Sequence, residues 1–322
     1  MKKFKLTGIL LPFLLSACTS TDNQEDKPNI IFILADDLGY MDTQAYAQKV
    51  LGTEKSQMYY ETPNIDKLVE EGVAFSHAYA TQLSAPTRAS ILTGKYAARI
   101  GFTTATPLTN TYYNQKMKVP LGNYAHDVLK HVDPIDIEHA WLNAKSNTAM
   151  PAGTSIDGEW DEISIAEALT DHHSAFIGKW HLRESKPECT PENQGFDYVF
   201  GGDPDGMVKS HFPDYGLASI SHENPQKYLT DLLTDKAVEY INAERNKPFF
   251  LFLSHYAVHD PIEAKKADID LFSNSSRKDN PKHFDAGYAA MVKSLDDNVN
   301  RVIEALKNSG VIENTIFIFF SD

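Results

Sequence analysis

The sequence predicts an α/β protein in which helices sandwich a mostly parallel sheet. Short, continuous apolar segments alternate with amphipathic segments of helical period, the order typical of parallel sheets with helices on both faces. Residues capable of chemistry follow directly after several apolar segments. In a parallel sheet such residues meet beyond the carboxyl ends of the strands. The 322 residues are enough for one large domain or two.

The first half of the predicted domain alternates between strand and helix. Residues 29–34 form a continuous apolar run, as expected of a buried parallel strand. Thr62-Pro63 begins a helix that ends at Gly72, because proline suits the first helical turn and glycine the end. Residues 73–80 are predicted as a strand that leads into the helix beginning near Ser84.

The second half repeats this alternation with longer helices. The last helix carries its apolar residues on one face and is expected to stop at Gly310. The expected helices span 163–170, 228–244 and 288–306, and the expected strands span 174–177, 249–253 and 315–320. Residues 103–161 are weakly periodic and predict an insertion over the active face.

The amino terminus is predicted to be a targeting segment. Residues 1–17 combine three lysines with an apolar core too short to span a membrane, and Leu-Ser-Ala-Cys18 resembles a bacterial lipobox. We expect cleavage before Cys18, lipidation of its thiol, and a polar tether over 18–27 ahead of a domain at 28–322. The protein would then be an exported lipoprotein of the periplasm or outer membrane that meets the membrane only through its anchor. A simple secretory signal with an accidental cysteine is the alternative.

The net charge of the chain limits the classes of partner that it can bind. Lysine and arginine number 30 against 44 aspartate and glutamate residues, which gives a formal net charge of −14. So acidic a protein is unsuited to neutralising phosphates, which argues against nucleic-acid binding. An anionic substrate must therefore meet a local cationic pocket.

The run from Ser84 to Lys95 predicts such a pocket. Ser84 stands just before Pro86 at an expected helix start, where free N–H groups and the helix dipole favour an anion. Arg88, four residues later, can turn back toward the Ser84 hydroxyl. The arrangement suits transfer of sulfate or phosphate. Lys95 closes the run, and the structural and anion-binding interpretations of it stay open.

Three further motifs follow predicted strands. Asp36-Asp37 are adjacent carboxylates that repel unless a cation holds them, which favours a hard metal, although a solvated turn is the alternative. Lys179 and His181 alternate with Trp180 and can project to the same side. The run from His255 to Pro261 follows a phenylalanine-rich strand, and Asp322 ends the last strand.

Together these motifs resemble the sulfatase family, whose signature C/S-x-P-x-R precedes a Leu-Thr-Gly element. The resemblance spans 28–322 and implies an alkaline-phosphatase-like fold. It implies that Ser84 is oxidised to formylglycine by a radical-SAM maturase, and that the aldehyde hydrate is the nucleophile. It further implies hydrolysis of sulfate esters, here on a sulfated carbohydrate. Thr87 stands where serine is more usual, a change that we expect to be tolerated.

The resemblance also assigns the site residues. It implies a calcium ion bound by Asp36, Asp37, Asp322 and the residue at 84. Arg88, Lys179, His181 and His259 take catalytic roles, with His259 selected because a single residue separates it from proline. His255 is out of that register and is as readily structural. A zinc site built from His255 and His259 is the weaker alternative.

Two departures and two rival functions remain. The family pattern continues Asp-Asn-Gly where this sequence ends at Asp322, and the family's C-terminal subdomain is missing, so we expect a truncated chain. One rival is a phosphatase or phosphodiesterase of the same superfamily that uses Ser84 directly, usually with two metals. The other is a non-catalytic glycan-binding lipoprotein built on a sulfatase scaffold.

Overall fold

The computed structural model describes residues 27–100, 111–113, 129–131, 162–182, 189–220, 227–243, 247–279 and 285–322. The predicted signal peptide, Cys18 and most of the 18–27 tether lie outside these residues. So does the predicted insertion at 103–161, apart from two short parallel strands, β2 (Thr111–Tyr113) and β3 (Leu129–His131). Those predictions stay predictions. None of the described helices is both long and apolar enough to cross a membrane.

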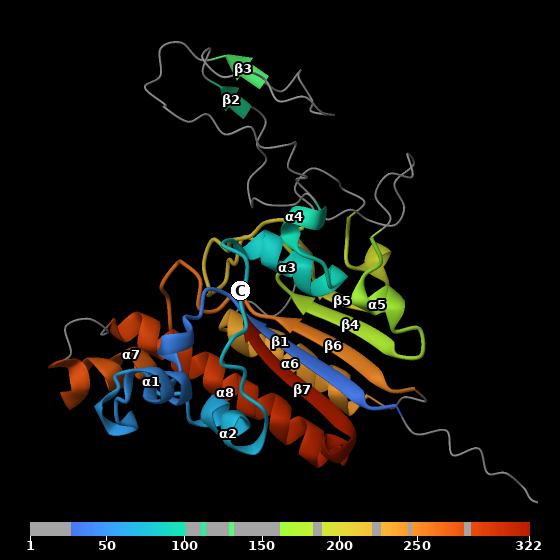
Figure 1. Ribbon diagram of the computed structural model, residues 1–322. Coiled ribbons are helices and arrows are strands. Elements are labelled where there is room, and N and C mark those ends of the chain that lie inside the picture. Colours follow the sequence, from blue (N-terminus) through green and yellow to red (C-terminus); the bar gives the residue numbers. More distant parts are fainter. Residues whose placement is uncertain are drawn as a thin grey trace, which may run out of the picture.

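A five-stranded parallel sheet forms the centre of the structure (Figure 1). Its order is β5-β4-β6-β1-β7, and every neighbouring pair runs parallel. Both segments predicted as dense apolar strands, β1 and β6, lie side by side inside it, where apolar residues are buried on both faces. The strands are β1 (Asn29–Ala35), β4 (His173–Gly178), β5 (Tyr198–Gly201), β6 (Phe249–Ser254) and β7 (Thr315–Ser321).

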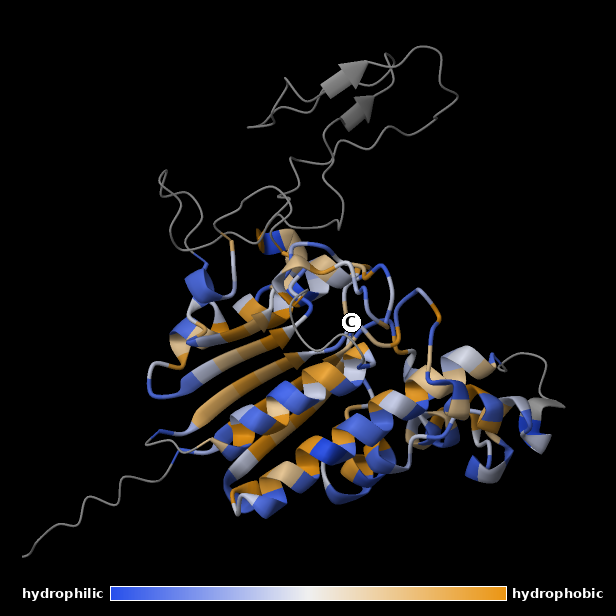
Figure 2. Cartoon of the chain, turned by 180° about the vertical axis from the view of Figure 1, so that it is seen from behind, coloured by the Kyte–Doolittle hydropathy of each residue, from blue (hydrophilic) through white to orange (hydrophobic). Residues whose placement is uncertain are grey.

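Helices cover both faces, as the sequence predicts. On one face, α6 (Leu229–Asn242) and α8 (Ala286–Asn308) pack on the apolar side chains of β1, β4 and β6. Figure 2 shows this side, with hydrophobic and hydrophilic residues alternating along both helices. On the other face lie α3 (Ser84–Thr93), α4 (Ala97–Ile100) and α5 (Ile165–Ala168). The remaining helices are α1 (Gln44–Leu51), α2 (Pro63–Glu71) and α7 (Lys266–Ser273).

Most expected elements are confirmed, with boundaries that move by a few residues. Gly310 follows α8 with φ 70°, the left-handed conformation that ends a helix. The strand at 73–80 is wrong, because the segment pairs with no strand among the described residues. Its large apolar side chains Val73, Phe75 and Tyr79 stand at the even spacing of a strand, yet Val73 is 82% exposed and Tyr79 83%. A strand needs a neighbour to bond its backbone, and alternation alone does not provide one.

Candidate active site and metal centre

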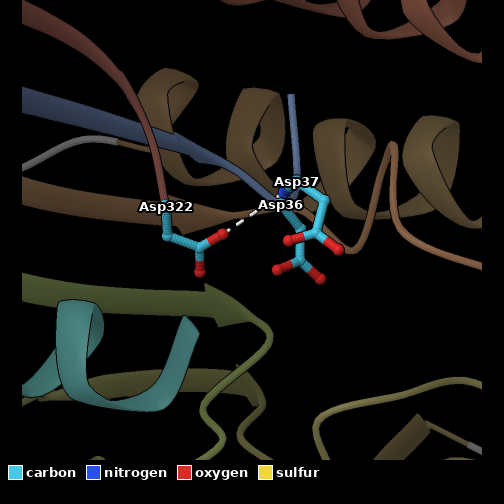
Figure 3. Close-up of side chains that lie close together, drawn as sticks. All are labelled: Asp36, Asp37 and Asp322. Carbon is cyan, nitrogen blue, oxygen red and sulfur yellow. Dashed lines mark hydrogen bonds between the residues drawn. The ribbon is translucent and has the colours of Figure 1, made fainter. Parts of the chain in front are cut away.

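Three carboxylates meet where β1 and β7 end. Asp36 and Asp37 follow β1 and Asp322 follows β7, and the parallel register pairs Ala35 with Ser321. One ligand oxygen of each of the three carboxylates lies within 4.8 Å of those of the other two (Figure 3). The Asp37 backbone N–H donates to Asp322 Oδ1 at 3.3 Å. Asp37 has φ 58°, an uncommon backbone conformation for a residue other than glycine, and such conformations concentrate at functional sites.

Ser84 places its hydroxyl beside this cluster from the first turn of α3. Its Oγ donates to Asp322 Oδ2 at 2.7 Å and lies 3.4 Å from Asp36 Oδ1. Arg88 Nε donates to the same Oγ at 3.0 Å, as the spacing of four residues predicts. The only proton of the hydroxyl is thus held toward a carboxylate while its oxygen faces a guanidinium.

Two buried cations balance the carboxylates. Lys179 Nζ lies 2.8 and 2.6 Å from the two oxygens of Asp36. Arg88 Nη2 lies 3.2 Å from Asp36 Oδ1 and 2.8 Å from Asp322 Oδ2. Lys179 follows β4 and Arg88 projects from α3, so the charges come from elements that the sheet order brings together. Buried charges require such pairing.

Burial and neighbouring charges shift the pKa values of these groups in opposite directions. Burial raises the pKa of Asp36 to about 6, although Lys179 and Arg88 pull it down. Burial also acts to raise the pKa of Asp322, but there Arg88 and Lys179 prevail and lower it to about 2. The pKa of Lys179 falls below its ordinary value because desolvation outweighs its carboxylate partners. Asp322 is therefore a firm anion, whereas Asp36 titrates closer to neutrality.

Two histidines flank the cluster. His259 follows β6, and its Nε2 lies 3.5 Å from Asp37 Oδ2 with its side chain 22% exposed. His181 follows β4 with φ 59°, the second uncommon backbone conformation in this region. Burial, then the charges of Lys179 and Arg88, lower its pKa to about 3. His181 is consequently neutral at physiological pH.

Comparison with known proteins decides the family. A family model described as sulfatase matches residues 28–127 and 136–322. The chain belongs to the sulfatase family. A sulfatase from Formosa agariphila is 30% identical over 379 residues, which cover 100% of this chain and 63% of the relative. N-acetylgalactosamine-6-sulfatase from Rattus norvegicus is 28% identical over 334 residues, 98% of this chain and 53% of that protein.

Solved sulfatase structures agree on the fold. The crystal structure of Ps i-CgsB superposes with a TM-score of 0.60 at 28% identity, over 92% of this chain and 58% of that one. PsFucS1 sulfatase from Pseudoalteromonas sp. superposes with a TM-score of 0.60 at 22% identity, and covers 93% of this chain and 56% of that one. The chain thus spans about half to two thirds of the length of these sulfatases.

Two residues considered from the sequence lie apart from this centre. His255 is fully buried, and neither ring nitrogen has a partner among the described residues. It belongs to the core, which leaves the zinc pair with His259 unsupported. Lys95 lies beyond the far end of α3, where its ammonium pairs with Glu162. The structural interpretation therefore holds for both side chains.

Sequence reasoning missed Ser254 as part of the site and included Gly178 only as the first residue of the Gly-Lys-Trp-His-Leu motif at 178–182. Ser254 ends β6, accepts from Arg88 Nη1 and donates to the Lys179 backbone carbonyl at 2.8 Å, so it contacts the Arg88 guanidinium and the Lys179 backbone. Gly178 ends β4 with φ 107°, and a Cβ there would lie 1.9 Å from the Ser254 carbonyl oxygen. The sequence signals for their roles were the glycine that ends β4 and the serine that ends β6, since both strands are otherwise largely apolar.

Proposed function

We propose that this sulfatase-family protein hydrolyses sulfate esters, with residue 84 as the nucleophile. The observation that carries the proposal is the surrounding of the Ser84 Oγ, which lies at a helix N-terminus between Asp322 and Arg88. A sulfate ester carries anionic oxygens around a crowded sulfur, so its cleavage requires nearby positive charge and an activated nucleophile. Arg88, Lys179 and the first turn of α3 supply the positive charge.

The carboxylates fit a hard divalent cation. Oxygen is the ligand atom that Ca²⁺ prefers, and the Asp36, Asp37 and Asp322 oxygens converge within 4.8 Å. Asp36 also contacts Lys179, yet a carboxylate has about four lone-pair sites and can accept from a lysine and bind a metal. These three residues and residue 84 would hold calcium. When present, the ion would supply charge neutralisation, and formylglycine at position 84 would supply the nucleophilic hydrate.

The remaining catalytic roles are assigned to individual side chains. Arg88 and Lys179 hold the sulfate oxygens, and Ser254 keeps the Arg88 guanidinium in place. His259 is partly exposed beside Asp37, where it can donate a proton to the leaving oxygen. His181, kept neutral by burial and its cationic neighbours, is the residue to which we assign the base role at residue 84.

The substrate we propose is a sulfated carbohydrate. Ps i-CgsB, which is 28% identical to this chain, has been crystallised in complex with k-i-k-neocarrahexaose. The relatives also include N-acetylgalactosamine-6-sulfatase. We further propose that a radical-SAM maturase oxidises Ser84 and that the protein is anchored at the cell envelope through Cys18.

Parallel assays on matched esters test the proposal. The matured protein should hydrolyse 4-nitrophenyl sulfate far faster than 4-nitrophenyl phosphate, and Ser84→Ala should abolish the activity. Lys95→Ala, just beyond the far end of the same helix and outside the site, should retain it. Faster phosphate hydrolysis with two bound metals would instead establish the phosphatase alternative. Glycan binding without turnover of either ester would establish the non-catalytic one.

A further inference from the structure

The chain that follows β5 contacts both histidines of the site. This segment, Asp203–His211, lies in the connection between β5 and α6, and no motif identified in the sequence includes it. We call it the support segment. Its contacts reach His181 at one end and the backbone of His259 at the other.

At its first end the support segment packs on His181. The backbone carbonyl of Asp203 faces the His181 N–H at 3.5 Å. A Cβ added to Gly206 would lie 2.2 Å from Cε1 and 2.3 Å from Nε2 of the His181 ring. The backbone at Gly206 therefore rests directly against the imidazole, and no larger residue fits without moving the ring. Asp203 is itself held, because its carboxylate accepts from the Ser219 backbone N–H at 3.2 Å and from the Ser219 hydroxyl.

At its other end the support segment holds the His259 loop. His211 Nε2 lies 3.0 Å from the His259 carbonyl oxygen. A carbonyl only accepts, so Nε2 must carry the proton of a neutral ring. Protonation of Nδ1 as well would bury a second donor that has no partner among the described residues. Glu263 fastens the same loop, because its Oε2 accepts from the His211 backbone N–H at 2.8 Å and the Ser210 hydroxyl at 2.6 Å.

We propose that the support segment positions both histidines for sulfate-ester cleavage, with Gly206 and His211 as positioning residues. The inference rests on the proposed function, which gives His181 and His259 their roles. The Gly206 backbone limits where the His181 ring can lie. The His211 side chain holds the His259 backbone in place through its hydrogen bond to the His259 carbonyl. Neither residue contacts the three carboxylates or Ser84 in any described interaction. Their loss should therefore lower kcat much more than it changes KM.

Four variants of the full chain test this. Gly206→Ala pushes on the His181 ring, His211→Phe removes the donor to His259, and His211→Gln keeps an N–H donor. Lys209→Ala is the matched control, because this exposed lysine lies on the same segment and pairs only with exposed Asp214 at 2.9 Å in the described structure. With 4-nitrophenyl sulfate, Gly206→Ala and His211→Phe should lower kcat by at least about tenfold, toward the roughly 100-fold that a 1 Å misplacement costs. His211→Gln should recover part of the loss, and Lys209→Ala should match the parent.

Hydrogen exchange separates this inference from the proposed function. In His211→Phe, amides of residues 257–263 should exchange at least about tenfold faster while those of α8 keep their rates. That measurement needs no turnover, so it decides the role of His211 even if the protein proves inactive on every sulfate ester. Unchanged exchange at 257–263 would overturn the inference, as would parental kcat in a folded His211→Phe variant. If Gly206→Ala does not fold, the His211 pair decides alone.

Discussion

Replacing His255 by phenylalanine should change how stability depends on pH. His255 follows β6 and is 0% exposed, and its backbone N–H donates to the Leu34 carbonyl at 2.9 Å. Burial lowers its pKa to about 3, with Asp231 acting in the opposite direction. Phenylalanine has a similar ring, cannot titrate, and removes two buried ring nitrogens that have no partner among the described residues.

The magnitude follows from proton linkage. In the unfolded chain a histidine titrates near its ordinary pKa of about 6.5, whereas the folded protein takes up no proton at His255 until about pH 3. Between these values the unfolded state binds the extra proton, so stability falls as pH falls. Integrated from pH 7 to pH 5, this one group removes about 2 kcal/mol of unfolding free energy. His255→Phe should escape that loss.

Urea unfolding followed by tryptophan fluorescence at pH 7 and pH 5 measures the effect. The parent should lose about 2 kcal/mol more between the two pH values than His255→Phe does. His77→Phe is the matched control, because His77 is exposed and its replacement should leave the parental pH dependence in place. Equal losses in the parent and His255→Phe would refute the assignment of His255 to the dry core.

Three other substitutions have expected outcomes. Gly178→Ala should lower unfolding free energy by at least about 2 kcal/mol, because its Cβ meets the Ser254 carbonyl at a φ of 107°; an unchanged melting temperature would contradict this. Lys95→Ala should leave kcat unchanged and cost at most about 1 kcal/mol, because it breaks only a partly exposed pair with Glu162; a large loss in kcat would restore an anion-binding role. Ser164→Ala should lower the free energy of unfolding measured in urea by about 1 kcal/mol, because it removes the capping box of α5. An unchanged free energy of unfolding would show that the cap does not stabilise the protein.

The parallel sheet made much of the site predictable. Continuous apolar runs predicted β1 and β6, because strands covered on both faces need apolar residues at nearly every position. A similar run predicted β7, although this strand lies at the edge of the sheet with Ile316 48% and Ile318 37% exposed. Once strands are parallel, their carboxyl ends share an edge, which is why Asp36, Lys179 and Asp322 could be expected to meet.

Other features depend on tertiary contacts that no local pattern contains. The four residues of β5 are too few to signal an edge strand, and residues 73–80 were predicted as a strand but have no described strand to pair with. His255 and His259 are four residues apart, yet one lies in the core and the other beside Asp37. Only the turn after β6 separates them. The role of the support segment could not be predicted for the same reason. Gly206 is required only because the His181 ring lies against its backbone, and this contact forms only in the folded protein.

The state of residue 84 tests the central claim most directly. The protein should be produced with and without a radical-SAM sulfatase maturase, and each preparation should be examined by peptide mass spectrometry and by turnover of 4-nitrophenyl sulfate. We predict a loss of about 2 Da at Ser84, the two hydrogens removed when an alcohol becomes an aldehyde, with turnover proportional to the modified fraction. Full sulfate-ester turnover by a preparation whose Ser84 is unmodified would contradict the account.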